Sequence, residues 1–150
     1  MPCINHRQCI NDALTRAEAI CARSGARFTQ IRRDVLREIW SSHEAVKAYD
    51  LIERLSRDGE QLKPPTVYRA LDFLLEQGLI HRIESLNAFV GCERPQEPHQ
   101  AILMICEHCS DIEESDGSEV QTVLTGVTGH TGFIARSAVI ELRGLCRRCR

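Results

Sequence analysis

The sequence predicts an α+β fold in two parts, a winged helix-turn-helix domain followed by a small α/β domain that carries paired cysteines. Three observations lead to this fold class. Apolar residues recur at helical spacing through four segments of the first half, two short strand-like segments follow, and two Cys-x-x-Cys pairs stand in the last third. Because 43% of the 150 residues are hydrophobic, the chain can bury a real core.

The first three helices are predicted by apolar stripes at spacings of three and four residues. These stripes cover residues 13–21, 31–40 and 48–55. Gly25 suits the C-terminus of the first helix, and Thr29 can cap the start of the second. The third helix is expected to end near Gly59, and roughly the first ten residues are expected to be frayed.

A fourth helix and a hairpin complete the first part. Pro64 and Pro65 suit a helix start, and Gly78 stops the apolar stripe that begins at Thr66. Residues 79–85 and 88–92 then read as two strands around a short polar turn. Three helices, a recognition helix and a hairpin are the order of a winged helix-turn-helix, which we assign to residues 1–93.

The charged, proline-containing residues 94–99 are predicted to be a hinge. Residues 100–150 are then a second domain of mixed type. We expect strands over residues 101–106, 112–114 and 133–142, and a helix over residues 119–129. Residues 133–142 are assigned to a strand because their apolar positions alternate.

The strongest chemical signal is the pair of motifs Cys106-Glu-His-Cys109 and Cys146-Arg-Arg-Cys149. Two cysteines three positions apart can turn both thiolates toward one point, and two such pairs complete the tetrahedral four-sulfur shell that zinc prefers. A single pair would also fit a redox site or a disulfide, but two matched pairs favour structural zinc.

A second group of donors is scattered: His81, Cys92, His99 and Glu114. Spacing alone does not connect them, and each one taken singly is more often an ordinary surface or core side chain. His81 and Cys92 nevertheless stand at the same end of the predicted hairpin, and His99 and Glu114 lie beyond the hinge. Two imidazoles, a thiolate and a carboxylate would suit zinc, while the thiolate argues against manganese.

The remaining cysteines and histidines are not expected to bind metal. Cys21 reads as a small apolar side chain of the first helix, and Cys3 and Cys9 as part of the frayed terminus. His6 and His43, like His108 and His130, are expected to be solvated or locally hydrogen-bonded.

The composition indicates where in the cell the protein acts, but it does not indicate what the protein binds. No apolar run approaches the roughly 20 residues that span a bilayer, and the N-terminus lacks a secretory pattern, so we expect a cytoplasmic protein and no membrane contact. Regular cysteine pairs in a reducing compartment indicate metal before disulfides. The net charge of −2 gives no indication of nucleic-acid binding.

The segment Lys63-Pro-Pro-Thr-Val-Tyr-Arg-Ala-Leu-Asp-Phe-Leu-Leu-Glu-Gln-Gly78, with both cysteine pairs, resembles the ferric-uptake-regulator family of bacterial repressors over residues 27–149. The resemblance implies a homodimer that binds palindromic operator DNA when loaded with metal. It also implies two zinc ions per subunit, a structural one on the four paired cysteines and a regulatory one on the scattered donors. A single histidine before the first pair weakens an iron reading, and Ser137 stands where many relatives have a histidine.

Candidate DNA contacts lie off the apolar stripe of the fourth helix at Thr66, Tyr68 and Arg69. An arginine there can donate two hydrogen bonds to guanine. The resemblance adds Tyr49, at the start of the third helix. The candidates for phosphate contact are Arg23, Arg27, Arg32 and Arg33. Each of these arginines could equally belong to a solvated helix face.

The resulting hypothesis is a zinc-dependent repressor of zinc-uptake genes that has no enzymatic activity and no small organic substrate. One alternative is a sister regulator of the same family that senses iron, manganese, nickel or peroxide. A more distant alternative is a cysteine-based redox protein. A zinc hydrolase or deaminase would need an open metal position and a general base, and a four-thiolate site offers no open position.

Overall fold

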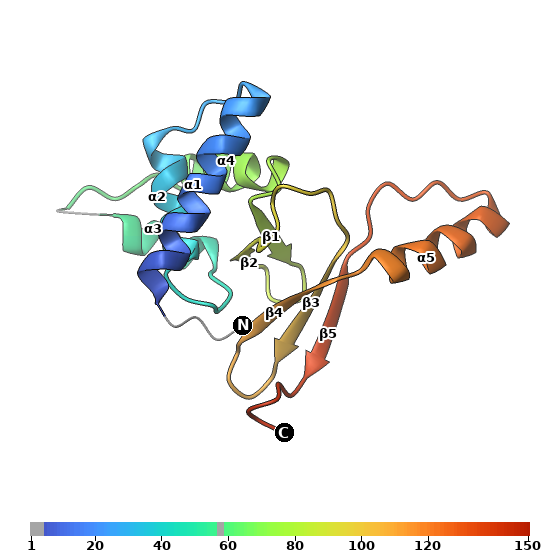
Figure 1. Ribbon diagram of the computed structural model, residues 1–150. Coiled ribbons are helices and arrows are strands. Elements are labelled where there is room, and N and C mark those ends of the chain that lie inside the picture. The colour runs from blue at the N-terminus through green and yellow to red at the C-terminus, as the bar shows by residue number, and fades with distance from the viewer. Residues whose placement is uncertain (1–4, 57–58) are drawn as a thin grey trace. The chain divides into compact units, whose positions relative to one another are not determined.

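The computed structural model describes residues 5–56 and 59–150, which divide into two compact units (Figure 1). The first unit covers residues 1–96 and the second covers residues 97–150. This division falls within the segment 94–99 assigned to a hinge, and its role as a hinge stays a prediction. Among the described residues, no helix combines the length and apolar character needed to cross a membrane.

The described residues of the first unit form four helices and one hairpin, in the order that the sequence predicts (Figure 1). The elements are α1 (His6–Ser24), α2 (Gln30–Ile39), α3 (Ala48–Leu55), α4 (Pro64–Glu76), β1 (Ile80–Ile83) and β2 (Ala88–Gly91). The two strands are antiparallel, with His81 opposite Val90. Helix α3 ends at Leu55, before the expected position, and residues 57 and 58 lie outside the described residues.

Helix α1 begins earlier than the sequence suggests. The side chain of Asn5 accepts a hydrogen bond from the backbone N–H of Arg7 at 3.1 Å and so caps the helix. Residues 6–10, expected to be frayed, are therefore helical, and Cys9 packs against the core. Cys3 lies outside the described residues. At the other end Gly25 has φ of 70°, a left-handed conformation that favours glycine as the C-cap.

The core of the first unit takes side chains from all four helices and the hairpin. Leu36, Leu51 and Leu71, one from each of α2, α3 and α4, are almost completely buried. Cys21 is buried with them, as expected of a small apolar side chain. Backbone hydrogen bonds between Val46 and Phe89, 2.8 Å in both directions, attach the segment before α3 to strand β2. This core holds helix α4 and the hairpin in fixed positions.

The second unit is a three-stranded sheet with one crossover helix (Figure 1). Its elements are β3 (Ala101–Cys106), β4 (Ile112–Asp116), α5 (Ser118–Thr131) and β5 (Ile140–Gly144). The strand order is β4-β3-β5, in which β3 pairs antiparallel with β4 and parallel with β5. Parallel neighbours need a crossover connection, and α5 supplies it.

The strand predicted over residues 133–142 is wrong in its first part. Strand β5 begins only at Ile140, which pairs with Ile102. Because β3 starts at Ala101 and its pairing with β5 begins at Ile102, residues 133–138 lie beyond the end of β3. The carbonyl oxygen of Ala138 instead accepts a hydrogen bond from the Gln100 side chain at 3.1 Å. Alternating apolar residues are not sufficient for a strand when no partner is beside them.

The second unit buries few apolar side chains. Leu103, Ile105, Cys106 and Ile112 are its buried hydrophobic residues. Helix α5 buries none of its residues. Large apolar side chains that remain exposed are Val120, Val123, Val127, Phe133, Ile134, Val139, Leu142 and Leu145. This unit therefore derives less stability from its own core than the first unit does.

Candidate metal centres and DNA-contact surface

The four paired cysteines come together at one end of the sheet in the second unit. Cys106 ends β3 and pairs with Gly144, the last residue of the parallel strand β5. Parallel strands end at the same edge, so the turns that follow β3 and β5 bring Cys109 and Cys146 together, with their Sγ atoms 3.7 Å apart. The four Sγ atoms all lie within 4.8 Å of one another, which is compatible with a shared metal ion.

Backbone hydrogen bonds prepare this cluster to hold negative charge. The backbone N–H groups of Cys109 and Cys146 donate to Sγ of Cys106 and lower the pKa of that thiol to about 6. A side-chain hydrogen bond with Cys146 raises the pKa of Cys149 to about 12. One thiolate therefore forms readily while a neighbour retains its proton, and a divalent cation would displace that proton by binding the thiolate form.

A cation of the protein lies beside the cluster. The guanidinium of Arg148 donates to the carboxylate of Asp111 at 2.8 Å. A hydrogen bond with Cys146 raises the pKa of Arg148 further, so this side chain carries its positive charge. Four thiolates around one divalent ion have a net negative charge, which Arg148 partly offsets.

His81 and Cys92 lie on the same face of the hairpin in the first unit. The backbone N–H of Cys92 donates to the carbonyl of Leu79 at 3.0 Å, which extends the β1–β2 pairing by one position. Since side chains alternate along a strand, Cys92 faces the same side as Leu79 and therefore as His81. The ligand atoms of His81 and Cys92 lie within 4.8 Å of each other.

His99 and Glu114 form the corresponding pair in the second unit. The imidazole Nδ1 of His99 lies 2.7 Å from the carbonyl oxygen of Glu97, which can only accept, so Nδ1 carries the proton. This bond turns Nε2 toward the Glu114 carboxylate, 2.5 Å away. Metal-ligating histidines are typically held in this way, with one nitrogen donating to a backbone carbonyl and the other left to bind the ion, so Nε2 and the Glu114 carboxylate could bind one cation together. Because the two pairs stand in different units, the complete set of four ligands stays a prediction.

The candidate base-reading residues lie at or near the solvent side of the first unit. Tyr49 on α3 is 73% exposed, and Tyr68 on α4 is 50% exposed. Arg69 is exposed beside Tyr68, while Thr66 is half-buried. Tyr49 and Tyr68 line one hollow of about 350 Å³ between α3, α4 and the hairpin. The exposed N-terminal part of a helix with an adjacent hairpin suits insertion into a major groove.

Two cations in this hollow are absent from the sequence-based candidates. Lys47 precedes α3 and Arg82 lies on β1, and both line the hollow with the tyrosines. The side chain of Asn87 at the hairpin turn accepts a hydrogen bond from Arg82 at 2.9 Å. Helical periodicity could not have identified these residues, because only the folded hairpin brings them beside α3 and α4.

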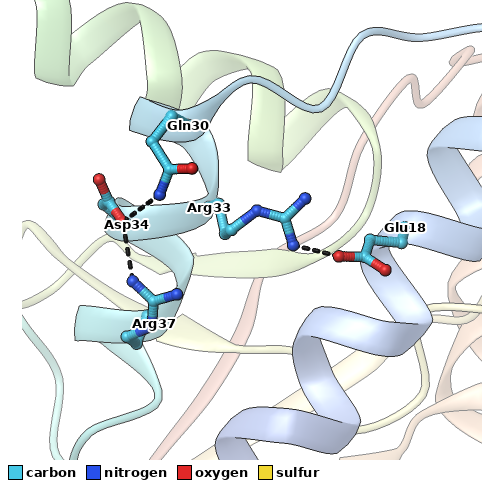
Figure 2. Close-up of polar contacts among 5 residues, drawn as sticks. All are labelled: Glu18, Gln30, Arg33, Asp34 and Arg37. Carbon is cyan, nitrogen blue, oxygen red and sulfur yellow. Dashed lines mark hydrogen bonds and ion pairs between the residues drawn. The ribbon is translucent and has the colours of Figure 1, made fainter.

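The four candidate arginines differ in their surroundings. Arg23 and Arg27 are exposed. The guanidinium of Arg33 is paired with Glu18 on α1, as Figure 2 shows. The guanidinium of Arg32 lies over the ring of Phe73, 3.6 Å from its centroid. Arg23 and Arg27 are therefore better placed for phosphate contact than the other two.

The neighbouring polar contacts on α2 are local. Asp34 accepts hydrogen bonds from Gln30 at 2.9 Å and from Arg37 at 2.8 Å (Figure 2). Exposed pairs of this kind contribute about 0.2–1 kcal/mol each. They hold side chains on the α2 surface and explain little of the stability of the first unit.

A winged-helix unit joined to a small α+β unit with a four-cysteine cluster defines the class: a metal-binding transcription regulator. Residues 23–143 match the model of the ferric uptake regulator family, and the chain belongs to that family. It is 42% identical over 139 residues to the zinc uptake regulation protein of Escherichia coli, covering 92% of this chain and 81% of that protein.

Solved structures give the same relationship. A zinc uptake regulator complexed with zinc and DNA is 41% identical to the chain, with a TM-score of 0.88 and 93% of both chains covered. Holo XcZur is 37% identical, with a TM-score of 0.84, covering 92% of this chain and 96% of that one. These matches confirm the predicted family and the α+β fold of a regulator with DNA-binding and dimerisation parts.

Proposed function

We propose that this chain is a zinc-responsive transcription repressor, which binds palindromic operators of zinc-uptake genes as a homodimer when its regulatory site holds zinc. The observation that carries the proposal is the donor set on either side of residues 94–99. A relative with 42% identity is named for zinc uptake regulation, and a solved relative holds both zinc and DNA. Such a repressor acts in the cytoplasm, where it meets its operator.

Two sets of donors support the proposal of two zinc ions per subunit. The four cysteines provide the closed sulfur shell of a structural ion, which would fasten the ends of β3 and β5. His81 and Cys92 in one unit, with His99 and Glu114 in the other, provide the mixed shell of the regulatory ion. Thiolate and imidazole donors favour zinc over manganese, which prefers oxygen.

In this proposal, zinc regulates DNA binding by fixing the orientation of the DNA-binding unit relative to the second unit. Residues that share one ion across 94–99 would restrict the angles available to that segment. The two recognition helices of a dimer have to stand about 34 Å apart to meet successive major-groove turns. A chain with a free hinge samples many angles, so its apparent affinity falls with the fraction that is competent.

The homodimer would form through the second unit. Val120, Val123 and Val127 recur along α5 and are exposed, as are Leu142 and Leu145 at β5. Strand β5 is an edge of its sheet, so one side of its backbone can pair with another strand. A second copy would cover these apolar side chains, and the winged-helix units would then be presented as a symmetric pair.

Operator binding by zinc-titrated protein tests the proposal. Fluorescence anisotropy on a palindromic operator should show affinity that rises at least 100-fold as the regulatory site fills, equal to about 2.7 kcal/mol of coupling. Cys92→Ser should lose most of this rise while keeping its structural zinc. Cys21→Ser, which changes another buried cysteine, should retain it. Equal zinc responses of Cys92→Ser and the parent protein would exclude the regulatory site, and a response to manganese alone would favour a sister sensor.

A further inference from the structure

Two histidines outside both proposed zinc sites meet in the first unit. His6 is the first residue of α1, and His43 lies in the segment between α2 and α3. Their ring centroids are 5.1 Å apart, with an angle of 37° between the ring planes. The sequence places them 37 positions apart (43 minus 6), so the fold alone brings them together.

The environment of His43 needs an explanation. Its Nε2 atom is shielded from solvent and has no hydrogen-bond partner among the described residues. Shielded polar atoms are normally paired, and an orphaned one calls for an explanation such as a bound ion, an ordered water or a functional role. The expectation that His43 is solvated or locally hydrogen-bonded is therefore wrong for this nitrogen.

The ring spacing fits a shared ion. Metal–imidazole bonds are about 2.0–2.1 Å long, and two imidazoles at a tetrahedral angle have ring centroids about 5 Å apart. We propose that His6 and His43 bind a divalent transition-metal ion, with water in the remaining coordination positions. Imidazole donors suit zinc, copper and nickel, whereas calcium and magnesium prefer oxygen.

The charges near the pair set its strength. His6 stands at the N-terminus of α1, whose dipole is positive there, and the first turn of the helix has no acidic residue. The dipole opposes a cation and no carboxylate in that turn offsets it, and two protein ligands are fewer than four, so this site is weaker than the four-cysteine site. Cys9, one turn further along α1, is disulfide-bonded and is not one of the proposed ligands.

A bound ion would cross-link two segments of the DNA-binding unit. Helix α1 packs against α2 and buries Ala13, Ala17 and Cys21, and the His6 end of the helix lies beyond these buried residues. An ion on His6 and His43 would fix this end to the segment before α3. Because α3 carries Tyr49, the site would be linked to the DNA-contact surface through one short segment.

Zinc stoichiometry of the full chain tests the proposal. Equilibrium dialysis against micromolar free zinc should give one more zinc per chain for the parent protein than for His6→Ala or His43→Ala. His130→Ala, at the exposed end of α5, should match the parent protein. His6 is exposed, so its replacement should leave the fold intact.

Histidine NMR signals give an independent measurement. When zinc is added to protein already saturated at its stronger sites, the ring signals of His6 and His43 should shift together. In His6→Ala the His43 signal should no longer follow zinc. Equal stoichiometry in all variants, or a lost equivalent in His130→Ala, would overturn the two-histidine site.

Discussion

At the scale of single residues, the contact between Trp40 and Gly91 links the core to a candidate zinc ligand. A β-carbon added at Gly91 would lie 2.2 Å from the indole ring of Trp40, far inside van der Waals contact. Gly91 ends β2 and is followed directly by Cys92. The indole ring therefore fixes the position of the strand end that presents Cys92, and only glycine allows this approach.

Gly91→Ala should consequently destabilise the first unit by about 1–3 kcal/mol, the usual cost of overpacking. The indole ring or the strand has to move, so the emission of Trp40, the single tryptophan of the chain, should change in the folded state. Gly144→Ala is the control, because a β-carbon there meets nothing within 4 Å. Denaturant melts of both variants, followed by tryptophan fluorescence, provide the measurement. Equal stability of the two variants would contradict the close approach.

Residue chemistry was predictable where the pattern was local. The spacing within each Cys-x-x-Cys pair already brings its two thiolates together, so the sulfur cluster could be inferred before the fold was known. The contacts of His43 could not, because His6 is distant in sequence and reaches it only through the packing of α1. Lys47 and Arg82 were missed for the same reason, since the hairpin brings them to the surface of α3 and α4.

At the scale of elements, a helix or strand predicted from the sequence forms where a neighbouring element packs against it or pairs with it. Helix α4 and the hairpin follow their apolar patterns because the core beside them accepts those side chains. Residues 133–138 have a strand-like pattern and form no strand, because β3 does not extend beside them. Helix α1 starts earlier than expected because Asn5 caps it, and apolar periodicity does not detect a cap.

Helix α5 is the element with the weakest internal support. It contains Gly126 and Gly129, buries no side chain and has several threonines. Glycine in a helix interior costs about 0.8–1.0 kcal/mol relative to alanine. A β-carbon at Gly126 meets nothing within 4 Å of the chain's own atoms. Gly126→Ala should therefore stabilise the second unit by about 0.4–1 kcal/mol and increase helicity, as measured by circular dichroism and denaturant melts. A decrease would indicate that another molecule occupies this space.

At the scale of the whole molecule, the two units differ in how much apolar core stabilises each of them. The first unit has a core built from four helices and a hairpin, in which large side chains such as Leu36, Leu51 and Leu74 are fully buried. The second unit buries four hydrophobic residues and exposes apolar side chains along α5 and β5. A small domain with so little core depends on a metal ion or a partner for stability.

Removal of metal should therefore destabilise the second unit much more than the first. A strong zinc chelator should greatly increase hydrogen exchange in β3, β4 and β5, because metal-binding free energy is folding free energy in such a domain. Exchange in α2 and α4 should change little, since their protection comes from apolar burial. Cys92→Ser without chelator is the matched control: it lacks a regulatory ligand, keeps the four-cysteine cluster and should retain protected strands. If α4 lost protection as fast as β3, or if the strands exchanged rapidly in the control, the four cysteines would not be what holds the second unit together.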